Sequence, residues 1–152
     1  MEREQYLELL NKIDDPLHGE WPGGWNKTFY DAAEAKFLKL AEEIQQALGE
    51  RCAIEYGNLI QDASFHGQLD VPESCLTQQY VVSLRVSNFG SLATLYDADD
   101  VLKAECLNKI KSAVKRNGYT YLPSWVLREA YPVRNEGITG MHNWGHRYFD
   151  YL

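Results

Sequence analysis

Two histidines near the end of the chain have a spacing that suits metal binding. His142 and His146 lie four residues apart, and Asp150 lies four residues further on. On one continuous helix this spacing places two imidazoles and a carboxylate on the same face, as a zinc-dependent hydrolase requires. The zinc-protease form of the pattern has a glutamate after the first histidine, where this chain has Asn143. A small metal-dependent hydrolase using His142, His146 and Asp150 is therefore the alternative hypothesis for function.

The residues around these histidines favour a packed tail over a metal site. Gly145 weakens a helix in the middle of the pattern. Arg147 is placed to pair with Asp150 or to bond to exposed backbone groups. An ordered chain end of this kind generally needs docking onto the rest of the protein. The sequence therefore predicts an aromatic tail folded against the core through its large apolar side chains: Trp144, Tyr148, Phe149, Tyr151 and Leu152.

Two other groups of residues are candidates for binding a partner protein. Trp21 and Trp25 lie in the kinked loop "HGEWPGGW", and exposed indoles offer a large contact area at low entropy cost. The alternative is that both cover the end of the following helix. The acidic corner Asp97, Asp99 and Asp100 lacks the glycine and the distant glutamate of a calcium loop. We expect it to begin a helix, with docking of a basic partner as a second role.

The remaining motifs point to no catalytic chemistry and to no cofactor. The stretch "GSL" at 90–92 lacks the setting of a hydrolase nucleophile, and "WPGGWNKTF" has the wrong glycine spacing for a phosphate loop. Cys75 is expected to be the most exposed thiol, with no adjacent base to activate it. Ser64, His66 and Gln68 alternate along a predicted strand, which indicates a solvated sheet face or a binding surface.

Charge is distributed unevenly along the 152 residues, whose net charge is −7. Residues 1–100 carry eighteen acidic and seven basic side chains, whereas residues 101–152 carry four acidic and eight basic ones. An acidic surface disfavours nucleic acid, because phosphate contacts depend on clustered lysine and arginine. It favours a basic protein partner, since complementary charge speeds encounter. The simpler alternative is that the charge only keeps the protein in solution.

The length, hydropathy and cysteine content predict a single cytoplasmic domain, residues 1–152. No run approaches the roughly 20 apolar residues that a membrane helix needs, so no membrane partner is expected. The start, "MEREQYLELL", is acidic and amphipathic, unlike a secretory signal. Three widely spaced cysteines fit reduced thiols better than a disulfide framework.

Hydrophobic periodicity predicts an α+β fold. Apolar residues at helical spacing indicate a short helix over 3–13 and a longer one from a Thr28 cap to Gly49. Period-two alternation then predicts two hairpins over 52–71 and 80–96, and a further helix opens at Asp97. We therefore expect two N-terminal helices, an antiparallel meander of four or five strands, one helix on a sheet face, and the aromatic tail.

Three stretches together suggest a family resemblance: "RVSNFGSLATLYD", "GYTYLPSWVLREAYP" and "NWGHRYFDYL". The combination resembles small uncharacterised bacterial cytosolic proteins that end in an aromatic Arg-Tyr-Phe-Asp-Tyr tail. Size and acidity are also similar to those of immunity proteins that neutralise bacterial toxins. This resemblance implies a role class, and it assigns no functional residue.

The preferred hypothesis is therefore a non-catalytic acidic protein that inhibits or escorts a basic protein partner, such as a toxin domain. A self-associating structural module is a third hypothesis, with the outer sheet edge or the tryptophan loop as its contact.

Overall fold

The computed structural model describes residues 1–15, 26–57, 65–132 and 142–149 of the chain. Helices and strands are mixed, so the predicted α+β class is confirmed. The elements, in chain order, are α1 (Arg3–Ile13), α2 (Lys27–Leu48), β1 (Ile54–Gly57), β2 (His66–Asp70), the 3-10 turn η1 (Glu73–Cys75), β3 (Ser83–Val86), β4 (Leu92–Leu95), α3 (Ala104–Arg116), β5 (Thr120–Tyr121), α4 (Ser124–Leu127) and α5 (Trp144–Tyr148).

The long helix α2 begins and ends at local signals in the sequence. The side chain of Asn26 accepts hydrogen bonds from the backbone N–H groups of Thr28 and Phe29. Asn26 is therefore the cap, and the prediction that Thr28 caps this helix was wrong. Gly49 ends the helix with a φ of 71°, the left-handed conformation that glycine adopts at low cost.

None of the described helices combines the length and the apolar character needed to cross a membrane.

Five strands form one sheet in the order β1-β2-β3-β4-β5. The first four strands pair antiparallel, as predicted. The prediction of a purely antiparallel meander was wrong, because β4 and β5 pair in parallel, with Leu92 opposite Thr120 and Ala93 opposite Tyr121. A parallel pair needs a crossover connection, and α3 lies in that connection. The sheet is therefore mixed.

The helix predicted from Asp97 begins at Ala104. The segment before it bonds to the chain near η1 instead. The Lys103 N–H donates to the Cys75 carbonyl at 2.8 Å, the Thr77 N–H donates to the Val101 carbonyl at 2.8 Å, and Leu102 forms an isolated bridge with Leu76. These long-range bonds use backbone groups that a longer helix would need.

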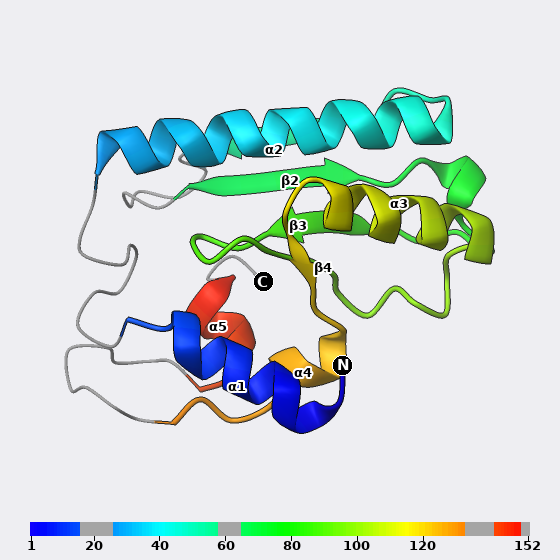
Figure 1. Cartoon of the computed structure of the whole chain (residues 1–152). Coiled ribbons are helices and arrows are strands. Elements are labelled where there is room, and N and C mark those ends of the chain that lie inside the picture. The colour runs from blue at the N-terminus through cyan, green and yellow to red at the C-terminus, as the bar shows by residue number, and fades with distance from the viewer. Residues whose placement is uncertain (16–25, 58–64, 133–141, 150–152) are drawn as a thin grey trace.

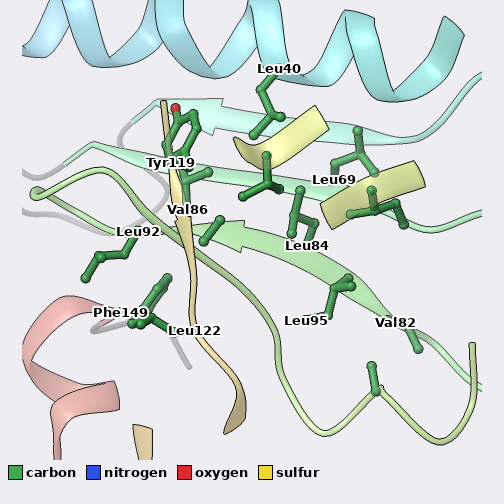
Figure 2. Close-up of a cluster of buried hydrophobic side chains, with 14 of the residues drawn as sticks. Leu40, Leu69, Val82, Leu84, Val86, Leu92, Leu95, Tyr119, Leu122 and Phe149 are labelled. Atoms are coloured by element: carbon green, nitrogen blue, oxygen red, sulfur yellow. The ribbon is translucent and has the colours of Figure 1, made fainter. Parts of the chain in front are cut away.

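Two helices, α2 and α3, pack side by side over one face of the sheet, where a single helix was predicted (Figure 1). Gly67 allows the close approach of α2, because a Cβ there would lie 2.8 Å from the Phe37 ring. Figure 2 shows the buried aliphatic side chains that fill this layer, which include Leu40 of α2, Leu69 of β2, and Leu84 and Val86 of β3.

The helices α1, α4 and α5 form a second group beside the sheet (Figure 1). Trp144, Tyr148 and Phe149 are all fully buried, so the predicted packing of the tail is confirmed for these residues. The Tyr148 hydroxyl donates to the Leu10 carbonyl at 2.6 Å, and the backbone carbonyl of Tyr148 accepts a hydrogen bond from the Asn88 N–H at 2.9 Å. Tyr151 and Leu152 lie outside the described residues.

A buried ion pair fastens the tail to the end of α1. Arg147 Nε lies 2.6 Å from Asp14 Oδ1, and both side chains are fully buried. The Tyr131 hydroxyl donates to the second Asp14 oxygen at 2.7 Å, and Arg147 Nη2 donates to the Asp15 carbonyl at 2.9 Å. Buried charges need such additional hydrogen bonds to offset their lost hydration.

Candidate partner-binding surface

The acidic corner between β4 and α3 lies on the surface. Asp97, Asp99 and Asp100 are all exposed. They form turns and do not begin α3, which corrects the expectation that they open a helix. Asp97 has a φ of 52°, a left-handed conformation that aspartate and asparagine tolerate better than most residues. The corner is therefore a fixed turn that presents its carboxylates to solvent.

Asp97 holds this turn against α4. Its backbone N–H donates to the Ser124 hydroxyl at 2.6 Å, and its carboxylate accepts a hydrogen bond from Arg128. These bonds partly offset the charge of Asp97 and fix the position of α4. Asp97 thus contributes mainly to the shape of the surface.

Asp99 accepts a hydrogen bond from the Tyr121 hydroxyl at 3.0 Å. Burial, together with the nearby charge of Asp99, raises the pKa of Tyr121, so the phenol stays a neutral donor. A neutral donor leaves the negative charge of Asp99 in place, and no described cation forms an ion pair with Asp99 or Asp100. Two of the three carboxylates therefore remain available to a basic partner.

Exposed aromatic side chains lie next to this corner. Trp125 of α4 is 45% exposed and packs edge-on against Tyr6 of α1, with ring centroids 5.7 Å apart. Tyr96 is 40% exposed, and the Arg128 guanidinium lies 5.6 Å from its ring centroid. Because Ser124 bonds to Asp97, both aromatics are tied to the acidic turn. We call Tyr96, Asp97, Asp99, Asp100 and Trp125 the aromatic–acidic surface.

Sequence reasoning found the acids of this surface and missed its aromatics. Trp125 precedes Val126 and Leu127, which are both buried, so its position in a short apolar helix gave no sign of exposure. Alternation along residues 92–96 predicts that Tyr96 shares one strand face with Leu92 and Thr94. That strand ends at Leu95, so Tyr96 lies beyond it at the surface.

The histidine pair does not share a helix face. The helix α5 begins at Trp144 with Asn143 as its cap, so His142 lies before the helix. The His142 N–H donates to Nδ1 of His146 at 3.4 Å, and the two ring centroids are 5.7 Å apart. Within the described ranges no group of three metal-ligating side chains occurs. Asp150, the third ligand of the metal hypothesis, lies outside those ranges.

Gly145, which the sequence predicts to weaken a helix in the tail, has a packing role. A Cβ at this position would lie 3.1 Å from the Asn143 side-chain oxygen and 3.3 Å from the Leu127 carbonyl. Both distances are tighter than usual, so glycine allows α5 to pack closely against α4.

The other candidates from the sequence either lie outside the described residues or are at least partly buried. Trp21, Trp25 and Ser64 lie outside the described residues. His66 is fully buried, so it does not belong to a solvated sheet face as predicted, while Gln68 is half-buried. Cys75, predicted to be the most exposed thiol, is also buried, and burial raises its pKa to about 12. We therefore attribute the low reactivity predicted for Cys75 to burial.

Comparison with known proteins identifies no relative: no family model, no curated protein and no solved structure matches this chain. The resemblances to bacterial proteins with an aromatic tail and to immunity proteins accordingly stay predictions.

Proposed function

We propose that this chain is a non-catalytic, acidic binding protein of the bacterial cytoplasm that docks a basic protein partner through the aromatic–acidic surface. Inhibition of a toxin domain, as immunity proteins perform, is the proposed biological form of this binding. The observation that carries the proposal is an exposed tryptophan, Trp125, on a helix fixed to a turn with three exposed carboxylates.

The aromatic side chains supply the apolar centre of the proposed interface. Tryptophan and tyrosine are enriched among residues that dominate binding energy, because they bury large areas in contact with a partner. The helix that carries Trp125 is fixed both by buried side chains and by hydrogen bonds just beyond its end. Val126 and Leu127 anchor it in the core, and Arg3 forms two hydrogen bonds of 2.7 and 2.8 Å with Glu129 beyond its end. Such preorganisation lowers the entropy cost of binding.

The carboxylates supply long-range attraction and orientation. The net charge of −7 attracts a cationic partner before contact, and Asp99 and Asp100 place negative charge at the edge of the aromatic contact. Charges at an interface rim mainly raise the association rate and make it depend on salt. The surface therefore suits a basic protein with an apolar pocket surrounded by lysine or arginine.

Binding kinetics test this proposal. The probes are the basic proteins encoded beside the gene for this chain, measured by surface plasmon resonance from 50 to 500 mM salt, a range over which the Debye length falls from about 14 to about 4 Å. The variant Trp125→Ala should weaken affinity about thirtyfold, the loss typical of a central aromatic anchor. The variant with Asp99→Asn and Asp100→Asn should lower the association rate, and this effect should fade at high salt.

A matched variant removes the same amount of charge elsewhere. Asp31 and Glu42 are exposed on α2, which lies at the opposite side of the molecule from α4 (Figure 1), so Asp31→Asn with Glu42→Gln should change the association rate much less. Equal effects of the two double variants would contradict a localised site. Affinity that is independent of both salt and Trp125 would refute the proposal.

A further inference from the structure

A hollow of about 320 Å³ lies between the first half of α2 and the turn that joins β3 to β4. This volume falls within the range of pockets that hold small molecules. The hollow is separate from the aromatic–acidic surface, since the two share no residue. Tyr119, which follows α3, closes one side and lies beside Val86 of β3 (Figure 2).

The walls of this hollow are apolar and rich in aromatic rings. Phe29, Phe65, Phe89 and Tyr119 contribute rings, and Ala33 contributes a methyl group. Phe29 is 55% exposed although it belongs to this wall. An occupant that covered this ring would remove apolar surface from water. Aromatic walls favour a flat aromatic occupant, because rings pack well in offset or edge-on arrangements.

One cation, Lys36, stands among these apolar walls. Its Nζ donates to the Ser91 hydroxyl at 2.6 Å and to the Gly118 carbonyl at 3.2 Å, and it lies 4.4 Å from the Tyr119 ring centroid. Among the described residues no carboxylate pairs with Lys36. Burial lowers the pKa of the Lys36 ammonium group. A ligand carboxylate beside it would raise that pKa again. An ammonium group has three donors, so one remains for an anion.

A buried acceptor, Asn88, lines the same hollow. Asn88 is only 3% exposed, and its side-chain Oδ1 accepts no hydrogen bond from the described part of the chain. Its backbone N–H is already used by the Tyr148 carbonyl. This oxygen has almost no surface open to solvent, so a ligand donor reaches it only when the Asn88 amide turns toward the hollow. Such a bond would recover the free energy that a buried acceptor without a donor costs.

We propose that this hollow binds a small aromatic carboxylate that also carries an N–H or O–H donor. The ring lies among the aromatic walls, the carboxylate accepts a hydrogen bond from Lys36 Nζ, and the donor bonds to Asn88 Oδ1 after the Asn88 amide turns toward the hollow. The ligand ring matches the aromatic walls, its carboxylate matches Lys36, and its N–H or O–H donor matches Asn88. This inference is independent of the proposed protein partner.

Three probes of similar size separate these contributions in the unmodified chain. Indole-3-acetate has both the carboxylate and the N–H, indole-3-ethanol lacks the carboxylate, and naphthalene-1-acetate lacks the N–H. By isothermal titration calorimetry, indole-3-acetate should bind about tenfold tighter than the alcohol, because bonds to charged groups are the stronger ones. It should bind about threefold tighter than the naphthalene acid, as expected for one neutral hydrogen bond.

Variants locate the effect in the hollow. Lys36→Met should abolish the preference for carboxylate over alcohol while keeping the binding of the alcohol, which also shows that the variant is folded. Lys39→Met removes an exposed lysine three residues further along α2 and should keep the preference. Methyl resonances of Ala32 and Ala33, which line the hollow, should shift when indole-3-acetate is added.

Several results would overturn the proposal. These are equal affinities for the three probes, unchanged alanine methyl resonances, or the same loss of preference in the Lys36 and Lys39 variants. No binding of indole-3-acetate at millimolar concentration would overturn it as well.

Discussion

Arg147 shows how one residue can join distant parts of this chain. The sequence suggested Asp150 or exposed backbone groups as its partners. The structure shows Asp14 as its partner, 133 positions away in the chain. The guanidinium also lies 4.6 Å from the Phe89 ring centroid, so it connects α5, α1 and the β3–β4 turn. Spacing in the sequence finds local partners only, which is why this ion pair could not be predicted.

Removing this guanidinium should strongly destabilise the fold. Arg147→Met leaves Asp14 buried without its cation, a change that typically costs about 3–5 kcal/mol in the free energy of unfolding. Urea unfolding followed by tryptophan fluorescence measures the loss. Arg116→Met is the matched control, because Arg116 pairs with Glu43 at the surface and surface pairs contribute little. A loss in Arg147→Met no larger than in the control would show that the buried pair is unimportant for stability.

The three thiols should differ in reactivity. Cys75 is 2% exposed and its pKa is raised to about 12, whereas Cys52 and Cys106 are half-buried. Because the thiolate is the reactive form, Cys75 should be alkylated much more slowly by iodoacetamide at pH 8. Peptide mapping by mass spectrometry gives the three rates, and the difference should vanish in urea. Alkylation of Cys75 as fast as that of Cys52 in the folded protein would contradict its burial.

At the scale of elements, the ends of α2 follow local signals and the start of α3 does not. Asn26 and Gly49 act through bonds and conformations within a few residues of the helix ends. The start of α3 depends on bonds between residues 101–103 and the chain near η1, which lies more than twenty positions earlier. Local signals were therefore sufficient for α2 and misleading at Asp97.

The cap of α2 can be tested with neighbouring substitutions. Asn26→Ala removes the acceptor for two backbone N–H groups and should lower the free energy of unfolding by about 1 kcal/mol. Thr28→Ala changes the residue that the sequence favoured as the cap and should have much less effect. Chemical denaturation of both variants decides between the two positions. A larger loss of stability for Thr28→Ala than for Asn26→Ala would show that Thr28 is the cap.

At the scale of the whole molecule, buried phenols link stability to alkaline pH. Burial raises the pKa of Tyr119 and is the largest cause of the raised pKa of Tyr121. Above the ordinary tyrosine pKa of 10.0 the unfolded chain loses these protons while the folded chain keeps them. The unfolded state then binds fewer protons, so stability is full below pH 10 and falls as the pH rises above it.

The variant Tyr119→Phe should therefore lose less stability than the unmodified chain between pH 9 and pH 11, the interval around the ordinary tyrosine pKa. Urea unfolding at a series of pH values measures the slope. Tyr80→Phe is the control, because Tyr80 is 55% exposed and should keep the unmodified slope. Identical slopes for all three proteins would contradict the raised pKa of Tyr119.

The sequence alone determined the α+β class, both N-terminal helices, the antiparallel pairing of the first four strands, and the burial of Trp144, Tyr148 and Phe149 in the tail. Gly49 is one example, since it ends α2 where the sequence predicted. Val82, Leu84 and Val86 are another, since they alternate along the predicted hairpin over 80–96 and are all buried. Such signals are local, because helix caps and strand periods are set by neighbouring residues.

Only the tertiary structure decided which distant groups meet. It paired β5 in parallel with β4, joined Arg147 to Asp14, exposed Trp125 on a helix bonded to the turn at Asp97, and placed Asn88 in a hollow with Lys36. These arrangements depend on contacts between segments far apart in the chain, and residue type and spacing carry little information about them. Both proposed binding sites belong to this second group, which is why the sequence indicated only the acidic half of one of them.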